Sequence, residues 1–148
     1  MDICMYLLRP SSYLMVFELV REFRGVIGIL GHVRLSPGFY VYVGSARKGA
    51  LIRLRRYCSK SFAKPRWHID YLLEFSKIDR FYIVFNAHES ELAALLSGTL
   101  DVAIPRFGAT DTRNTTHLFV YSEVLEELLR SRNYNYVRVT CDDILRCG

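Results

Sequence analysis

The sequence has no hydrophobic run long enough to span a membrane, and its N-terminus lacks the charged-then-apolar pattern of a signal peptide. We therefore expect an intracellular, cytoplasmic protein with no membrane partner. Internal repeats, low-complexity segments and linkers are also absent. Because 51% of the 148 residues are hydrophobic, the chain is predicted to fold as one domain with a substantial core.

Several well-known chemical signatures are missing. The sequence contains no Walker loop, no GxSxG nucleophile elbow and no HExxH zinc motif. It also contains no CxxC pair and no Cys/His spacing of the zinc-finger type. We expect reduced thiols at the scattered positions Cys4, Cys58, Cys141 and Cys147. The alternative is a disulfide, because intracellular proteins of some hyperthermophiles contain them.

Acidic residues are missing from the whole window between Glu22 and Asp70, which contains ten basic residues. These are Arg24, Arg34, Arg47, Lys48, Arg53, Arg55, Arg56, Lys60, Lys64 and Arg66. The rest of the chain carries all fifteen acidic residues. This asymmetry favours a polyanion such as nucleic acid as the partner of the basic part. The alternative is a positively charged face that only keeps the protein soluble.

Hydrophobic periodicity predicts an α+β fold with a small antiparallel sheet flanked by helices. Strands are expected at 12–20, 26–35, 39–44, 80–85 and 118–121. Helices are expected at 50–58, 65–75 and 122–129, and between a possible capping box that begins at Asn86 and a stop at Gly98. The first three strands follow one another closely, which predicts an antiparallel meander with further strands added to it. Residues 101–116 are expected to form a long loop, and 134–141 a last strand or an extended tail.

The stretch from Pro37 to Arg56 is the most informative part of the chain. Two tyrosines, Tyr40 and Tyr42, alternate with apolar residues at strand spacing, and Gly44 is expected to end that strand. A helix with Arg53 on one side follows. Phenols and guanidinium groups beside an open glycine turn suit a phosphate-bearing substrate. The alternative is a half-buried strand followed by a solvated basic helix.

A metal-dependent phosphodiester hydrolase needs a carboxylate for the ion, a base for the attacking water and a cation for the phosphate. Glu91 is the candidate metal ligand and Arg53 the candidate phosphate ligand. Tyrosines become candidates for proton transfer if nearby cations lower their pKa. Each of these residues has a purely structural alternative, as a surface glutamate, an exposed arginine or a core tyrosine.

Three strings in the sequence together resemble the GIY-YIG nuclease superfamily: residues 38–46, Arg53-Leu54 and residues 67–72. More closely, the chain is similar to a small archaeal and bacterial branch that is sometimes fused to endonuclease III-like repair proteins. The strings 107–111 and 117–119 also match that branch, and the resemblance covers about residues 11–121. It implies an α+β fold with a three-stranded antiparallel sheet. It also implies hydrolysis of DNA with one Mg²⁺ or Mn²⁺ ion.

The resemblance extends to individual site residues. The family's Tyr-Ile-Gly motif matches Tyr42-Val43-Gly44, and its Gly-Ile-Tyr motif matches Ser11-Ser12-Tyr13, because the two motifs lie on neighbouring strands. The separation of 29 positions between the two tyrosines is wide, and we expect the segment 26–35 to absorb it. By resemblance, Glu91 binds the ion, Tyr13 or Tyr42 helps to deprotonate water, and Arg53 steadies the phosphate.

Further residues are expected around this constellation. The candidate accessory residues are Tyr40, Tyr57, His68, Asp111 and His117. The candidate nucleic-acid-binding residues are Arg47, Lys48, Arg55, Arg56, Lys60, Lys64 and Arg66. Residues 122–148 are expected to add a C-terminal helix and an extended tail to the core of the domain.

Three functions are compatible with these patterns. The leading one is a metal-dependent DNA endonuclease acting in DNA repair, with RNA as an alternative substrate and a repair protein as a partner. The second is a nucleic-acid-binding module that kept the fold and lost the reaction. The third is a protein-interaction domain, which would show a large exposed apolar patch on residues 123–141.

Overall fold

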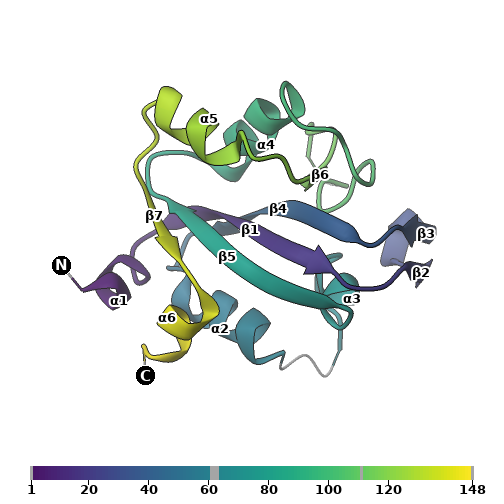
Figure 1. Ribbon diagram of the computed structural model, residues 1–148, viewed down its shortest axis with the longest axis horizontal. Coiled ribbons are helices and arrows are strands. Elements are labelled where there is room, and N and C mark those ends of the chain that lie inside the picture. Colours follow the sequence, from purple (N-terminus) through teal and green to yellow (C-terminus); the bar gives the residue numbers. More distant parts are fainter. Residues whose placement is uncertain (1, 61–63, 111, 148) are drawn as a thin grey trace.

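The computed structural model describes residues 2–60, 64–110 and 112–147 (Figure 1). Its central layer is a five-stranded sheet in the order β6-β4-β1-β5-β7, in which all neighbouring strands are antiparallel. The strands are β1 (Ser11–Leu19), β4 (Gly38–Ala46), β5 (Ser76–Val84), β6 (Leu118–Val120) and β7 (Tyr136–Val139). The predicted α+β fold with an antiparallel sheet flanked by helices is therefore confirmed.

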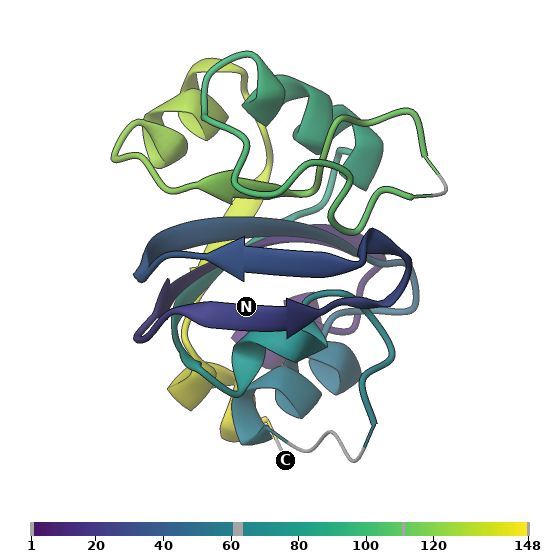
Figure 2. The same cartoon turned by 90° about the vertical axis from the view of Figure 1, so that its right-hand side faces the viewer.

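Helices cover both faces of the sheet, which gives the molecule three layers (Figures 1 and 2). The helices α4 (Glu89–Ser97) and α5 (Leu125–Ser131) lie on one face. The other face carries α1 (Ile3–Tyr6), α2 (Leu51–Ser59), α3 (Asp70–Leu73) and α6 (Cys141–Leu145). None of the helices in the described part of the chain has the length and apolar character needed to cross a bilayer.

The middle strand β1 is buried on both faces, as its continuous apolar run predicts. Its alternate residues enter two separate cores. Tyr13 and Phe17 pack into the core under α2, α3 and α6, whereas Leu14 and Val16 pack into the core under α4 and α5. Burial on both sides fixes the register of β1, because a slip of one residue would exchange the two sets of side chains.

The segment between β1 and β4 differs from the predicted meander. It forms a hairpin of β2 (Phe23–Val26) and β3 (His32–Leu35), joined by a short 3₁₀ turn, and this hairpin is a separate two-stranded sheet. Strand β1 instead pairs directly with β4 along its whole length, from Ser11 opposite Ala46 to Leu19 opposite Gly38. The long pairing between these two strands leaves the hairpin outside the main sheet.

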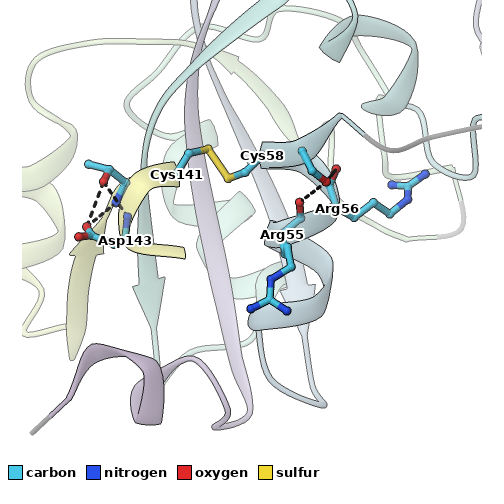
Figure 3. Close-up of a disulfide and its surroundings, with 7 residues drawn as sticks. Arg55, Arg56, Cys58, Cys141 and Asp143 are labelled. Atoms are coloured by element: carbon cyan, nitrogen blue, oxygen red, sulfur yellow. Dashed lines mark hydrogen bonds between the residues drawn. A yellow bond between two sulfur atoms is a disulfide. The ribbon is translucent and has the colours of Figure 1, made fainter. Parts of the chain in front are cut away.

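The C-terminal segment is part of the domain and not an extended tail. Of the two alternatives for 134–141, the structure has the strand, since β7 pairs with β5. Helix α6 follows and lies against α2, where the Cys58–Cys141 disulfide joins the two helices (Figure 3). A second disulfide, Cys4–Cys147, joins α1 to the segment just after α6. Cys147 lies two residues beyond the last residue of that helix.

The expectation of reduced thiols is therefore wrong. In both disulfides the Cα atoms lie 5.5 Å apart, within the usual range for a bridge. The partners are separated by 143 and 83 residues in the sequence, so no local spacing indicated the pairing. The pairs meet only because the first and last helices pack on the same side of the sheet as α2.

Candidate active site

The candidate active site starts at a close approach between strands β1 and β4. Tyr13 stands directly opposite Gly44 in the register of the two strands, and a Cβ atom on Gly44 would overlap the Tyr13 ring. Gly44 lies inside β4, which continues to Ala46, so it does not end the strand as predicted. The glycine is required here because the phenol ring of the neighbouring strand lies across its backbone.

Tyr13 lies behind the site rather than in it. Its side chain is completely buried, and its hydroxyl is 2.8 Å from the hydroxyl of Tyr57 on α2. Burial raises the pKa of Tyr13 well above its ordinary value, Tyr57 adds to that increase, and the charge of Arg53 only partly opposes it. Tyr13 is therefore a neutral phenol that fixes α2 to the sheet.

An open cavity of about 320 Å³ lies in front of Gly44. Its lining comes from β4, α2, the first turn of α4 and the loop before β6. The lining residues are Tyr42, Gly44, Ser45, Arg47, Arg53, Trp67, Glu89, Gly108 and Thr112. The structure thus brings Tyr42 and Arg53 together beside Gly44, as the sequence predicts.

Arg53 contacts β4 and the Trp67 ring at this cavity. Its Nη1 donates a hydrogen bond to the backbone oxygen of Ser45, and its guanidinium lies 4.3 Å from the centre of the Trp67 ring. Both partners belong to elements that pack on α2. The position of the guanidinium is therefore set by the fold and does not depend on a ligand.

The carboxylate in the cavity is Glu89, and the predicted Glu91 lies elsewhere. Glu91 accepts a hydrogen bond of 2.6 Å from the Tyr134 hydroxyl and lines a neighbouring cavity with Ser12, Arg47 and His88. Two residues along a helix correspond to a rotation of about 200°, so Glu89 and Glu91 point in nearly opposite directions. The carboxylate of Glu89 is partly exposed and lies 3.9 Å from His117 Nδ1.

The residue at which α4 begins explains why Glu89, and not Glu91, faces the cavity. His88 is the N-cap residue, and its Nδ1 accepts a hydrogen bond from the amide of Ser90. This cap starts the helix at Glu89, which places Leu92 and Leu96 in the core and turns Glu89 toward β4. Sequence spacing instead put Glu91 at the edge of the apolar stripe and Glu89 in a possible capping box that begins at Asn86, whereas the observed cap is His88.

The pKa of the tyrosines is raised and not lowered as the proton-transfer hypothesis required. Burial raises the pKa of Tyr42, and the neighbouring Tyr13 and the Glu89 carboxylate raise it further. Tyr57 also has a raised pKa, chiefly because it is buried. In this structure the phenols near the cavity are neutral hydrogen-bonding groups at neutral pH.

Two of the predicted accessory histidines support the loop that closes the cavity. His68 Nδ1 accepts a 2.8 Å hydrogen bond from the amide of Gly108, and its ring packs against Phe107. Gly108 has a φ of 67° and lies against the Tyr42 ring, so a side chain there would be strained and crowded. His117 is buried, with Nε2 3.0 Å from the side-chain oxygen of Asn114.

Two other accessory candidates, Tyr40 and Tyr57, do not line the cavity. The Tyr40 hydroxyl donates to the backbone oxygen of Ser36 in the turn before β4. The Tyr57 hydroxyl contacts the Tyr13 hydroxyl behind the cavity. Asp111 lies outside the described residues.

The predicted basic residues separate into two groups. Arg47, Lys48, Arg56 and Arg66 line a larger cavity beside the first one. Lys60 instead donates to the backbone oxygen of Ser76, and Lys64 lies on an exposed loop. Arg55 and Arg56 leave α2 in different directions (Figure 3). Arg55 is partly exposed, and its Nη2 atom is buried without a hydrogen-bond partner.

Sequence reasoning missed Asp70. Its side chain is fully buried and accepts hydrogen bonds from both terminal nitrogens of Arg56, each at 2.8 Å. Its Oδ2 also accepts from the amides of Arg66 at 2.7 Å and Trp67 at 3.1 Å. A signal was present in the sequence, because Asp70 stands beside the apolar residues Ile69 and Leu72 of its helix. A carboxylate so close to a buried stripe needs partners.

The comparisons with known proteins place these residues in one family. A family model described as a domain of unknown function, DUF123, matches residues 12–136. No curated protein and no solved structure matches the chain. The matched range runs from β1 to the first residue of β7 and includes every lining residue of the cavity. The chain therefore belongs to the DUF123 family.

Proposed function

We propose that this protein is a metal-dependent DNA endonuclease of the GIY-YIG type that acts in DNA repair or processing. The observation that supports this proposal most directly is the meeting of Tyr42, Arg53 and Glu89 beside Gly44 in one open cavity. These residues come from β4, α2 and α4, which are far apart in the sequence. They supply a phenol, a guanidinium and a carboxylate to a single solvent-accessible point.

Arg53 is suited to hold the scissile phosphate. A guanidinium has five N–H donors, and the hydrogen bond to Ser45 uses the Nη1 group. The planar group can therefore still offer a pair of donors to two phosphate oxygens. Arg47 lines the same cavity and adds a second positive charge. Both charges favour the transition state, in which negative charge builds up on the phosphate oxygens.

Glu89 is suited to hold one Mg²⁺ or Mn²⁺ ion. Mg²⁺ usually keeps several water molecules and binds to proteins through one or two carboxylates, so a single partly exposed glutamate fits this ion. In the described ranges no group of three or more His, Cys, Asp or Glu side chains is placed to hold a metal. When bound, the ion supplies positive charge at the phosphate and lowers the pKa of its water.

The two tyrosines have different roles in this proposal. Tyr42 lines the cavity as a neutral phenol, so its hydroxyl can orient the attacking water by a hydrogen bond. Tyr13 is too deeply buried to reach substrate and acts as a positioning residue through Tyr57 and Gly44. The raised pKa of both phenols argues against either one as the base in the resting protein.

The second candidate is a nucleic-acid-binding module of the same fold without the reaction. The raised tyrosine pKa values favour it, because they leave no evident base among the phenols. In both versions the nucleic acid is DNA, with RNA as the alternative, and a repair protein is a proposed partner. A DNA substrate implies a cytoplasmic protein, and its two disulfides would then resemble those in intracellular proteins of hyperthermophiles.

The proposal is tested with two matched glutamate variants. Purified protein is incubated with branched, nicked and linear DNA in Mg²⁺ or Mn²⁺, and the products are separated on denaturing gels. Glu89→Gln should abolish cutting, whereas Glu91→Gln, two residues away on the same helix, should cut like the wild type. Unchanged cutting by Glu89→Gln contradicts the assignment. Salt-sensitive DNA binding by a wild type that never cuts supports the binding module instead.

A further inference from the structure

A second cavity, of about 520 Å³, adjoins the candidate active site. Its lining residues are Ser45, Ala46, Arg47, Lys48, Gly49, Ile52, Arg53, Arg56, Arg66 and Trp67. Ser45, Arg47, Arg53 and Trp67 line both cavities, so a chain that enters one can continue into the other. The volume lies within the range of about 300–1,000 Å³ that is typical of small-ligand sites.

The lining of this cavity combines cationic side chains with an aromatic and an apolar one. Five of its side chains are cationic and none is acidic. Trp67, the only tryptophan of the chain, contributes an indole ring, and Ile52 is 85% exposed at the same place. A site for a bare anion needs only the cations, and a site for an apolar molecule needs only the indole and Ile52. A nucleotide, with its flat base and its phosphate, uses both.

Three guanidinium groups lie over the Trp67 ring. The central carbons of the Arg53, Arg56 and Arg66 groups lie 4.3, 4.9 and 5.3 Å from the centre of the ring. Arginine beside an aromatic face is a recurring arrangement in sites that hold unpaired bases and the phosphates between them. Trp67 also lines three of the cavities, so part of its indole remains open to a ligand beside these charges.

The position of Trp67 is fixed by Asp70. This buried carboxylate binds the amides of Arg66 and Trp67 on one side and the guanidinium of Arg56 on the other. Burial alone would raise the pKa of Asp70, but the hydrogen bonds from Arg56, Arg66 and Trp67 outweigh it and lower that pKa. The carboxylate is therefore charged at neutral pH, and the turn that carries Trp67 is tied to α2 before any ligand arrives.

We infer that Trp67 is a stacking platform for one unpaired nucleotide next to the phosphate that is cut. The inference rests on the proposed function and specifies its substrate, a nucleic acid with a single-stranded segment at the cleavage position. In a duplex both faces of each base are covered by its neighbours, so the ring cannot stack on them. An unpaired base offers a free face to the indole, and its phosphates reach Arg47, Lys48 and Arg66.

The single tryptophan provides a direct test of base stacking. Its fluorescence is titrated with oligothymidylate, with an abasic deoxyribose-phosphate chain of equal length and charge, with a duplex, and with inorganic phosphate. Oligothymidylate should quench the emission and bind roughly 5- to 100-fold more tightly than the abasic chain, as expected from stacking of a base on an aromatic ring. An oligouridylate arm identifies the preferred strand, and a stronger response to either polymer supports the platform.

Variants at position 67 are compared by the anisotropy of labelled oligonucleotides, after circular dichroism has verified their fold. Trp67→Leu should bind oligothymidylate and the abasic chain equally, whereas Trp67→Phe should retain part of the difference because it keeps an aromatic face. Equal quenching by the abasic chain, by the duplex or by inorganic phosphate overturns the inference. So does a full preference for oligothymidylate in Trp67→Leu.

The outcomes for the platform and for the nuclease can be told apart. Stacking without any cleavage by the wild type supports the platform and contradicts the endonuclease. Cleavage that shows the same preference for single-stranded flanks in wild type and Trp67→Leu contradicts the platform and leaves the endonuclease in place.

Discussion

Tyr13 on β1 occupies the space that a side chain at Gly44 on β4 would need. The two residues face each other across neighbouring strands. The Tyr13 ring cannot withdraw easily, because it is fully buried and its hydroxyl is paired with Tyr57. One tyrosine and one glycine thus depend on each other for the shape of the sheet at the site.

This dependence predicts a strong effect of Gly44→Ala on stability. The added methyl group overlaps a ring that has no room to move, so the variant should lose about 1–3 kcal/mol or more of unfolding free energy. Tyr13→Ala should also destabilise, but the double variant should lose less than the sum of the two, because the methyl group fills part of the space left by the ring. Urea unfolding of the four proteins measures the coupling, and strict additivity would contradict the close contact.

Asp70 predicts a dependence of stability on acidic pH. The pKa of its carboxyl is lowered in the folded protein, so the unfolded state binds the proton first as the pH falls. The stability from this group is complete above the unfolded pKa of about 3.9 and is lost as the pH falls through the lower folded pKa. Asp70→Asn should cost about 3–5 kcal/mol at pH 7, since it leaves the Arg56 guanidinium without its charged partner.

The matched control is Glu74→Gln, which removes an exposed carboxylate close to Asp70 in the sequence. It should change the unfolding free energy by less than about 0.5 kcal/mol. Unfolding curves between pH 2 and 7 should show a smaller acid loss in Asp70→Asn than in wild type. If both proteins lost the same unfolding free energy at acidic pH, the pKa of Asp70 would not differ between the folded and unfolded states, and the prediction would be wrong.

The two disulfides predict a large effect of reduction. In the chain-entropy model, a bridge that closes a loop of about 100 residues stabilises a protein by about 4–5 kcal/mol. The cysteines are 143 residues apart in the first disulfide and 83 residues apart in the second. Removal of either pair by double serine substitution should therefore lower the melting temperature. Thiol titration of the unfolded, unreduced protein should detect no free thiol, and four free thiols would contradict the pairing.

The parts of the structure that local pattern determines were predicted well. The alternation along β1 and β4 and the helical spacing of α2 are properties of the sequence itself, so Tyr42 and Arg53 could be assigned to one site in advance. The carboxylate that lines the cavity could not be assigned in this way. Its identity depends on the phase of α4, which the His88 cap and the packing of Leu92 set. A shift of two residues in that phase exchanges Glu91 for Glu89.

Other features depend on which distant segments meet. The disulfide pairs, the buried partners of Asp70 and the position of Trp67 are set by the packing of α2 against α6 and of the turn before α3. None of these contacts leaves a periodic signal, and the chain offers only residue types as clues. A buried-looking aspartate and a lone tryptophan directly after Arg66 were visible, but their partners were not.

The β2–β3 hairpin has a consequence for how related proteins are compared. It leaves and rejoins the main sheet at the far ends of β1 and β4, so its length does not influence which residues of those strands face each other. The number of residues between Tyr13 and Tyr42 can therefore vary among relatives while the pair keeps its geometry. Alignments that penalise gaps in this interval will underestimate the similarity of related sequences. Aligning β1 and β4 separately avoids that penalty.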